Sequence, residues 1–397
     1  MKKKIKLLID FPLQDNELTK WCGVSFPPIF YKYLLKDPRF EVYHMNNCDL
    51  KNLDAILVIS AGSQKLFLNK KINQLNIISV LIWLENKSKI IQFFVSIVGY
   101  LFGLKKIGYY KKWFIPSLNY EKRLKNILSA NKKIKIIHRL DGSYQIICKN
   151  YGYDLSVKNI NYFADLTVYQ SNYCKDVWER GKKTIFGKSI TFKPKKTIKI
   201  YNGVDREIFR PDGEKILLKG KYNIIHVSAS SLPNKGLKTV LEFAEIFKKN
   251  SDFHFYLIGD QIRDPICGKD IKYFNNVTYL GFVNDHLQLA KYLRSSDIFL
   301  YPSKDDCSSN SIIEAMSSGL PIATIDSGGN KELIIKNEII AGIIIDKQNP
   351  AYAIKLIIEN YNFYRENAIK MVQKHHNIES ITSEYANAIC KEVEQAS

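Results

Sequence analysis

The 397-residue sequence predicts an α/β fold with two doubly wound parallel sheets. Short apolar segments alternate with longer segments of helical periodicity through both halves of the chain. Parallel strands need crossover connections, and helices of this length supply them. A charged connector at 203–222, interrupted by Gly203, Pro211, Gly213 and Gly220, separates the two series. We therefore predict two domains that meet in this connector.

The first half predicts seven short strands with helices between several of them. Apolar runs place the strands at 4–9, 39–44, 55–60, 77–84, 134–138, 166–169 and 198–201. Helical spacing of apolar residues places helices at 24–36, 64–74, 120–130 and 171–180.

The second half repeats the alternation. Strands are expected at 223–228, 253–258, 277–280, 298–301, 322–325 and 342–345. Helices are expected at 236–249, 285–295, 311–318, 330–336, 351–374 and 377–395. Ligands of open α/β sheets bind at the carboxyl ends of the strands, so we expect the binding cleft between the two domains.

Composition and missing motifs exclude several classes of protein. Seven scattered cysteines without CxxC or Cys/His ligand spacing indicate free thiols in a reducing compartment, with no zinc site. No GxxxxGK[ST], GxGxxG or GxSxG motif is present, which argues against a P-loop ATPase, a dinucleotide oxidoreductase and an α/β-hydrolase. The start MKKKIKLLID runs directly into a strand, so we expect no signal peptide and a cytoplasmic location.

Positive charge is concentrated in the first half. Residues 1–200 contain 36 Lys and Arg against 14 Asp and Glu, whereas the rest contains 23 against 25. This segregation indicates an anionic partner, and without a nucleic-acid-binding motif we expect a membrane and no nucleic acid. The apolar run 90–104, within the basic segment 87–115, is too short to span a bilayer. It fits either an interfacial segment on an anionic leaflet or a buried helix.

The segment 301–332 contains the most informative pattern. Asp306 and Glu314 lie on either side of Ser308, Ser309 and Asn310, which are placed at the predicted start of a helix. Free backbone N–H groups and the helix dipole attract anions at such a start. A phosphate held by these amides, with a carboxylate on either side to accept from hydroxyls, outlines a nucleotide-sugar site.

This pattern resembles the donor-site motif of the retaining glycosyltransferases of family four, which have two facing Rossmann-like domains (the GT-B architecture). The matching positions are Asp306, Glu314, Ala315, Met316, Gly319, Leu320, Pro321, Gly328, Gly329 and Glu332. The segments 200–211 and 232–236 resemble the family's interdomain connection and its phosphate-binding lysine loop. Two residues depart from the family pattern: Asp306 replaces the usual Glu, and Ser230 replaces an Arg.

The resemblance implies a role for each candidate residue. Lys235, otherwise an ordinary solvated loop cation, neutralises the diphosphate leaving group together with the amides of Ser308, Ser309 and Asn310. Glu314, otherwise a helix-dipole acid, accepts from the ribose hydroxyls, and Asp306 meets the sugar. His138 is presented to the cleft near the sugar and pyrophosphate, or Arg139 takes this place and replaces the missing cation. Gly23, Arg139 and Asp141 are candidates for an acceptor or phosphate loop, and no metal or cofactor is expected.

The resemblance also implies domain limits and a function. We expect an acceptor-binding domain at 1–202, a donor-binding domain at 203–375 and a helix at 376–397 that crosses back to the first domain. The predicted enzyme is a metal-independent hexosyltransferase that moves a sugar from a nucleoside-diphosphate sugar, preferably a UDP-sugar, to a hydroxyl of a lipid-linked saccharide. It would act in bacterial surface polysaccharide synthesis, peripherally on the inner face of the cytoplasmic membrane. A sugar-nucleotide 2-epimerase and a catalytically silent nucleotide-sugar-binding protein remain alternatives.

Overall fold

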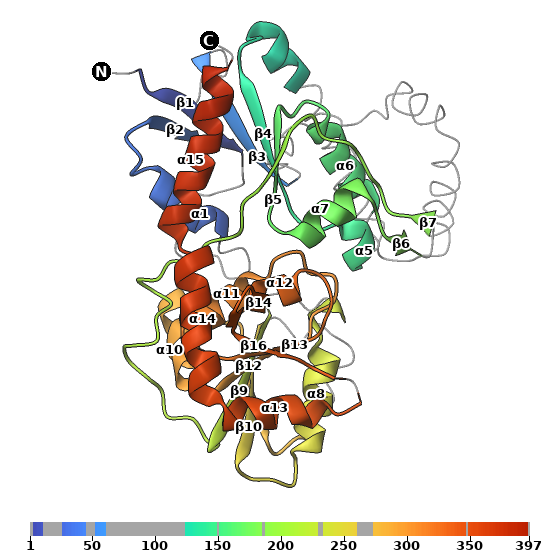
Figure 1. Ribbon diagram of the computed structural model, residues 1–397, viewed down its shortest axis with the longest axis vertical. Coiled ribbons are helices and arrows are strands. Elements are labelled where there is room, and N and C mark those ends of the chain that lie inside the picture. Colours follow the sequence, from blue (N-terminus) through green and yellow to red (C-terminus); the bar gives the residue numbers. More distant parts are fainter. Residues whose placement is uncertain are drawn as a thin grey trace.

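The computed structural model describes residues 3–10, 26–44, 52–60, 124–148, 151–184, 187–228, 233–259, 273–346 and 348–395. Two six-stranded parallel sheets form two domains that lie one above the other (Figure 1). The predicted fold class is confirmed. The strand predicted at 77–84, the helix at 64–74, the segment 87–115, Gly23 and Ser230 lie outside the described residues.

The N-terminal sheet has the strand order β2-β1-β3-β4-β5-β8. Its strands are β1 (Ile5–Asp10), β2 (Phe40–His44), β3 (Ala55–Ile59), β4 (Lys135–Leu140), β5 (Leu166–Tyr169) and β8 (Thr197–Lys199). Its helices are α1 (Phe26–Leu34), a helix over residues 124–130, α5 (Tyr144–Cys148), α6 (Tyr151–Asn161) and α7 (Asn172–Glu179). A short hairpin, β6 (Lys183–Thr184) and β7 (Gly187–Lys188), follows α7.

The C-terminal sheet has the strand order β11-β10-β9-β12-β13-β16. Its strands are β9 (Tyr222–Ser228), β10 (Phe253–Gly259), β11 (Val277–Gly281), β12 (Ile298–Tyr301), β13 (Ile322–Thr324) and β16 (Gly342–Ile344). Its helices are η3 (Pro233–Lys235), α8 (Leu237–Ile246), α10 (His286–Ser295), α11 (Asn310–Ser317), α12 (Asn330–Ile334), α13 (Pro350–Glu359) and α14 (Tyr361–His375). The hairpin β14 (Ile335–Lys336) and β15 (Ile339–Ile340) follows α12.

Two predicted helices end differently in the structure. The helix expected at 351–374 is divided into α13 and α14, because Asn360 between them has φ −119° and ψ 34°, outside the helical region. The helix expected at 330–336 ends at Ile334, since Ile335 is extended and begins a hairpin whose turn contains Asn337 at φ 52°. Asn tolerates such left-handed and turn conformations better than most residues.

Alternate side chains of each strand pack on opposite faces of the sheet, which explains why these strands are apolar throughout. Leu7 and Ile9 of β1 belong to the core with α1, whereas Leu8 packs on the other face with Leu124 and Ile127. The C-terminal sheet is covered on both faces in the same way. Both sheets therefore hold the carboxyl ends of their strands in fixed positions.

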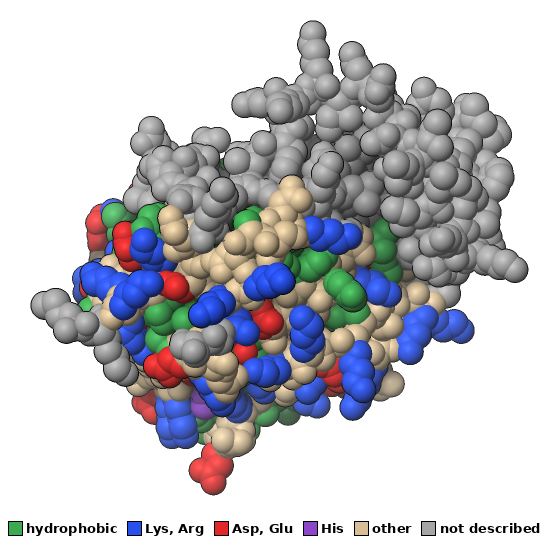
Figure 2. All heavy atoms as spheres, turned by 90° about the horizontal axis from the view of Figure 1, so that it is seen from above, with side chains coloured by type: hydrophobic (Ala, Val, Ile, Leu, Met, Phe, Trp, Pro, Cys, Tyr) green, Lys and Arg blue, Asp and Glu red, His purple; other side chains and the backbone are tan. Residues whose placement is uncertain are grey.

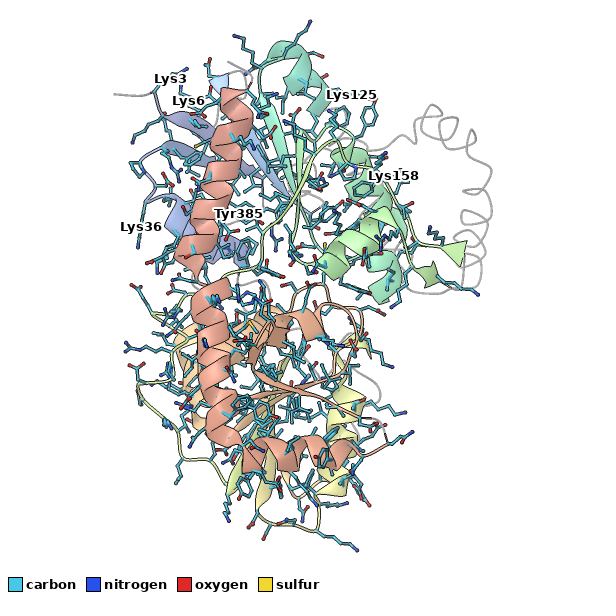
Figure 3. The ribbon with its side chains drawn as sticks, viewed as in Figure 1. Lys3, Lys6, Lys36, Lys125, Lys158 and Tyr385 are labelled. Carbon is cyan, nitrogen blue, oxygen red and sulfur yellow. The ribbon has the colours of Figure 1, made fainter. Side chains whose placement is uncertain are left out.

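The last helix, α15 (Ile378–Glu394), packs against α1 and β4 of the N-terminal domain. Tyr385 is fully buried, and its ring centroid lies 4.8 Å from that of Phe30 (Figure 3). At the crossing, the amide of Val204 donates to the carbonyl of His376 at 2.9 Å. Within the described part of the chain, no helix combines the length and apolar character needed to cross a bilayer.

Three histidines are fully buried and bonded to backbone carbonyls. His138 donates to Ser60 O at 2.7 Å, His226 to Leu300 O at 2.9 Å, and His376 to Asn202 O at 2.9 Å. Burial lowers the pKa of each imidazole to about 4. Each histidine therefore folds in its neutral form, whereas it would bind a proton near pH 6.5 in the unfolded chain.

We expect the free energy of unfolding to fall as the pH drops from 6.5 towards 4. The folded pKa of each histidine lies below the unfolded value, so its contribution is complete above pH 6.5 and is lost through pH 4. Buried Asp154 opposes this trend, because burial raises its pKa to about 7. The net difference of about two protons gives a slope on the order of 3 kcal/mol per pH unit. Urea unfolding at several pH values measures this slope.

A double variant, His226→Asn with His376→Asn, is the matched comparison. The Asn amide keeps a donor for the carbonyl but does not titrate, so the slope should become close to zero between pH 6.5 and 4. A slope as steep as that of the native protein would show that other groups control acid unfolding.

Candidate donor-binding site

The candidate site lies where the carboxyl ends of strands from both sheets face each other. In the C-terminal domain, η3 follows β9, and the segment 302–309 joins β12 to α11. In the N-terminal domain, Asp141, Gln170 and Asn202 follow β4, β5 and β8. In Figure 1, α7 of the N-terminal domain and α11 and α12 of the C-terminal domain lie on the sides of the two domains that face each other. This is the position at which open α/β sheets bind ligands.

Lys235 and Asp306 form the central ion pair of the site. Lys235 Nζ lies 2.6 Å from Asp306 Oδ2, and the side chains are 23% and 15% exposed. The Tyr301 hydroxyl donates to the same carboxylate oxygen at 3.3 Å. Burial by itself would lower the pKa of Lys235, but Asp306 and then Tyr301 raise it above its ordinary value. The lysine is therefore a permanent cation that remains partly open to solvent.

Glycines hold the two loops of this ion pair close to neighbouring backbone. Gly328 has φ +66°, and a Cβ there would lie 2.3 Å from Asp306 O. The next residue, Gly329, donates its amide to Asp306 O at 2.7 Å. Gly236, beside the lysine, has φ +81°, and a Cβ there would lie 2.3 Å from Pro302 O. Only glycine fits these approaches without movement of the backbone.

The start of α11 carries the three predicted anion-binding residues. Ser309 is the N-cap, and its hydroxyl accepts from Ile312 N at 3.4 Å. Ser308 is buried, and its Oγ has no hydrogen-bond partner among the described residues. Glu314 lies farther along the same helix and is 5% exposed. The unused Ser308 hydroxyl fits a site that is completed by a ligand.

A buried polar chain joins the N-terminal domain to the first residue of α11. Arg139 Nη1 donates to Asp141 at 2.6 Å and Nη2 to Asn202 at 2.7 Å. Asn202 in turn donates to Asn310 Oδ1 at 2.9 Å. The Arg139 guanidinium is 3% exposed and lies 4.7 Å from the ring centroid of Phe26. Arg139 is thus committed to holding the cleft wall and does not extend into the cleft as an open cation.

His138 is not brought to the surface of the cleft. It is fully buried in β4, where Nε2 bonds to Ser60 O and Nδ1 accepts from Asn161 at 3.1 Å. Both ring nitrogens therefore have protein partners. The structure brings Arg139, Asp141, Lys235, Asp306, Ser308, Ser309, Asn310 and Glu314 to the region between the domains, and it places His138 in the sheet behind them.

Two acids of the segment 301–332 bind the opposite domain. Glu332 accepts from the amides of Asn172 and Tyr173 at 3.1 and 3.2 Å, at the start of α7. Asp305, at φ 59°, accepts from the Tyr173 hydroxyl at 2.9 Å and also pairs with Lys182. A carboxylate at a helix start is stabilised by the free amides and the dipole. These contacts hold α12 and the loop after β12 against the N-terminal domain.

Sequence reasoning missed Asn202, Gln170, Tyr301 and Asp305 as site residues. Their positions could have identified them, because each lies at or just beyond the carboxyl end of a predicted strand. Among the described residues, no group of three or more His, Cys, Asp or Glu side chains is arranged to hold a metal ion. Metal-independent action stays a prediction.

The two facing parallel sheets define the GT-B class of glycosyltransferase fold. Sucrose-phosphate synthase from Thermosynechococcus elongatus has the same architecture, with a TM-score of 0.63, 16% identity and 100% coverage of both chains. Anabaena Alr3699/HepE in complex with UDP and glucose matches with a TM-score of 0.57 and 16% identity, over 98% of this chain and 100% of that one. At these identities the likeness concerns the fold alone.

Residues 209–374, which lie in the C-terminal domain, match the family model of glycosyl transferases group 1. A Campylobacter jejuni N,N'-diacetylbacillosaminyl-diphospho-undecaprenol alpha-1,3-N-acetylgalactosaminyltransferase is 29% identical over 185 residues, 46% of each chain. An Escherichia coli UDP-Gal:alpha-D-GlcNAc-diphosphoundecaprenol alpha-1,3-galactosyltransferase is 29% identical over 170 residues, 39% of this chain and 43% of that one. The chain thus spans less than half the length of these relatives.

Proposed function

We propose that the protein transfers a sugar from a nucleoside-diphosphate sugar to a hydroxyl of a lipid-linked saccharide, with retention of configuration. The observation that carries the proposal is the partly open Lys235–Asp306 pair beside the unused Ser308 hydroxyl at the start of α11. One cation, free amides and a spare hydroxyl supply the groups that a diphosphate requires. UDP is the preferred nucleotide, since the UDP-Gal transferase relative names it.

Each group of residues in the site has one role in the proposed transfer. As the bond between the anomeric carbon and the phosphate oxygen breaks, negative charge grows on the diphosphate, and Lys235 and the α11 amides stabilise it. The acceptor oxygen forms the new bond to the anomeric carbon and passes its proton to the leaving phosphate oxygen. Glu314 accepts from the ribose hydroxyls and Asp306 from the sugar hydroxyls.

Donor binding should change the partner of Lys235. In the structure its ammonium group is 2.6 Å from Asp306, which neutralises the pair. A diphosphate carries more charge than one carboxylate and attracts the ammonium more strongly. Asp306 is then released to bind sugar hydroxyls, so one exchange prepares both roles. The shorter Asp side chain still reaches the lysine here, although the family usually has Glu.

The acceptor and the location rest on two further observations. The relatives from C. jejuni and E. coli are named for diphosphoundecaprenol-linked saccharides. The first 200 residues carry a large excess of Lys and Arg, which suits the anionic inner face of the cytoplasmic membrane. We propose peripheral attachment there and a role in bacterial surface polysaccharide synthesis.

A screen of the purified chain against UDP-, GDP-, dTDP- and ADP-sugars, without added metal, tests the proposed function. We expect a higher melting temperature with one nucleotide series and slow release of its sugar, because water replaces the missing acceptor. Conversion of UDP-GlcNAc to its 2-epimer without acceptor would instead identify an epimerase. Nucleotide binding with neither hydrolysis nor transfer to undecaprenyl-linked saccharides would identify a binding protein.

A further inference from the structure

The N-terminal domain contains a cavity at the amino ends of its strands, opposite the carboxyl ends that face the candidate donor site. The cavity has a volume of about 770 Å³ and includes Lys135 at the start of β4, Asp165 just before β5, and Lys193 and Lys195 before β8. The six residues of β4 separate it from the cleft, a distance of roughly 20 Å at about 3.3 Å per residue. It is therefore separate from the candidate donor site.

Five lysines line this cavity, and we call it the lysine pocket: Lys132, Lys135, Lys158, Lys193 and Lys195. None of the five ammonium groups has an ion-pair partner among the described residues. The one acid of the lining, Asp165, already accepts from Ile136 N at 2.9 Å. Five cations around one hollow repel each other, and a bound polyanion would remove that repulsion.

The walls of the lysine pocket are fixed by the core. Phe192 donates its amide to Trp178 O at 3.1 Å, and its ring lies 5.4 Å from the buried Trp178 ring. Asn161 Nδ2 donates to Thr167 Oγ1 at 2.8 Å. The pocket is therefore built in advance, which lowers the entropy cost of binding.

The helix end at the pocket does not oppose an anion. The carbonyls of Lys158, Ile160 and Asn161, at the end of α6, accept from amides of the next turn at 3.0 to 3.1 Å. These contacts occupy the carbonyl groups that give a helix end its negative character. The remaining polar groups around the opening are mainly ammonium groups.

The pocket lies at the amino ends of β4, β5 and β8, whereas the candidate donor site lies at their carboxyl ends. Figure 3 labels Lys158 of the pocket and Lys125 of the helix over residues 124–130 in the N-terminal domain. Figure 2 looks down on the N-terminal domain and shows Lys and Arg side chains spread across its described part. Tyr162, at the rim, is 76% exposed. An exposed aromatic ring beside lysines is typical of surfaces that meet charged headgroups.

From this geometry we propose that the lysine pocket binds a phosphate-bearing anion, separately from the nucleotide sugar. Ammonium groups on flexible stems bind phosphate as point charges and adapt to its several oxygens. The phosphate comes either from the headgroup of an anionic lipid or from a soluble phosphorylated compound. The inference does not depend on transferase activity, because its test measures binding alone.

Two binding measurements on the full chain distinguish the sources. Sedimentation with vesicles of phosphatidylglycerol and phosphatidylcholine, against phosphatidylcholine alone, reports lipid binding. Calorimetry with inorganic pyrophosphate reports a soluble ligand. The test variant carries Lys132→Gln, Lys158→Gln and Lys193→Gln together. The control carries Lys249→Gln, Lys355→Gln and Lys370→Gln, at exposed positions in the C-terminal domain, and has the same net charge.

We expect the test variant to lose at least tenfold in affinity for one of the probes, while the control binds as the native chain does. A basic residue near an anionic surface contributes about fivefold, so three removals approach roughly 100-fold. Loss confined to vesicles identifies lipid, and loss confined to pyrophosphate identifies a soluble source. Equal behaviour of the two variants, or no binding of either probe by the native chain, would overturn the proposal.

Discussion

Lys235→Ala should slow sugar transfer by about 10² to 10³-fold, the usual cost of removing one preorganised charge from a developing anion. The lysine is the cation next to the α11 start, and its side chain is 23% exposed. Its removal leaves Asp306 charged beside the diphosphate, so repulsion adds to the loss. The melting temperature should change little, because a partly exposed ion pair contributes little to stability. Initial rates with the donor found in the screen measure the effect.

Two variants separate the possible roles of this lysine. Lys304→Ala alters an exposed lysine of the neighbouring loop, which carries Asp306, and should keep native activity. The double variant Lys235→Ala with Asp306→Asn removes both charges. If Lys235 acts on the diphosphate, the double variant loses the repulsion from Asp306 but stays far slower than the native protein. Recovery of the native rate in the double variant would show that the lysine serves only to neutralise Asp306, and the assignment would be wrong.

Gly328→Ala should both destabilise the protein and reduce transfer at least tenfold. The residue has φ +66°, and the new Cβ would lie 2.3 Å from Asp306 O and 2.8 Å from Asp306 N. These are backbone atoms, so the loop that carries Asp306 must move away from Lys235. We expect a loss on the order of 2–4 kcal/mol in the free energy of unfolding, from the left-handed conformation and the clash together.

Gly281→Ala is the matched control for this clash. Gly281 has a similar φ of +73°, but a Cβ there would meet nothing within 4 Å among the described residues. The substitution should therefore lower the free energy of unfolding only by the backbone strain, about 1 kcal/mol, and leave the rate of sugar transfer unchanged. Denaturant unfolding and initial rates on both variants give the comparison. Equal losses in the two would mean that the approach to Asp306 has no part in the function.

The sequence alone was sufficient for the architecture and for the position of the loop and helix start around Ser309. Continuous apolar strands alternating with helices are a local pattern, and burial of both sheet faces permits few other folds. The donor motif is also local. Asp306, Ser309 and Glu314 lie within nine residues. Ser309 is the N-cap of the helix that contains Glu314, and serine is a preferred residue at that position. Such features depend on neighbours in the chain, so sequence spacing reveals them.

Only the tertiary structure decided which side chains meet across the domains. Asn202 bonds to Asn310 over a separation of 108 residues, and Glu332 caps α7 over 160. His138 is buried within the sheet and Arg139 donates to Asp141, although both lie near the end of a strand that leads to the cleft. The lysine pocket likewise collects residues from three separate segments. Contacts of this kind follow from how sheets and helices pack, because periodicity fixes which face is buried but not which distant residue lies against it.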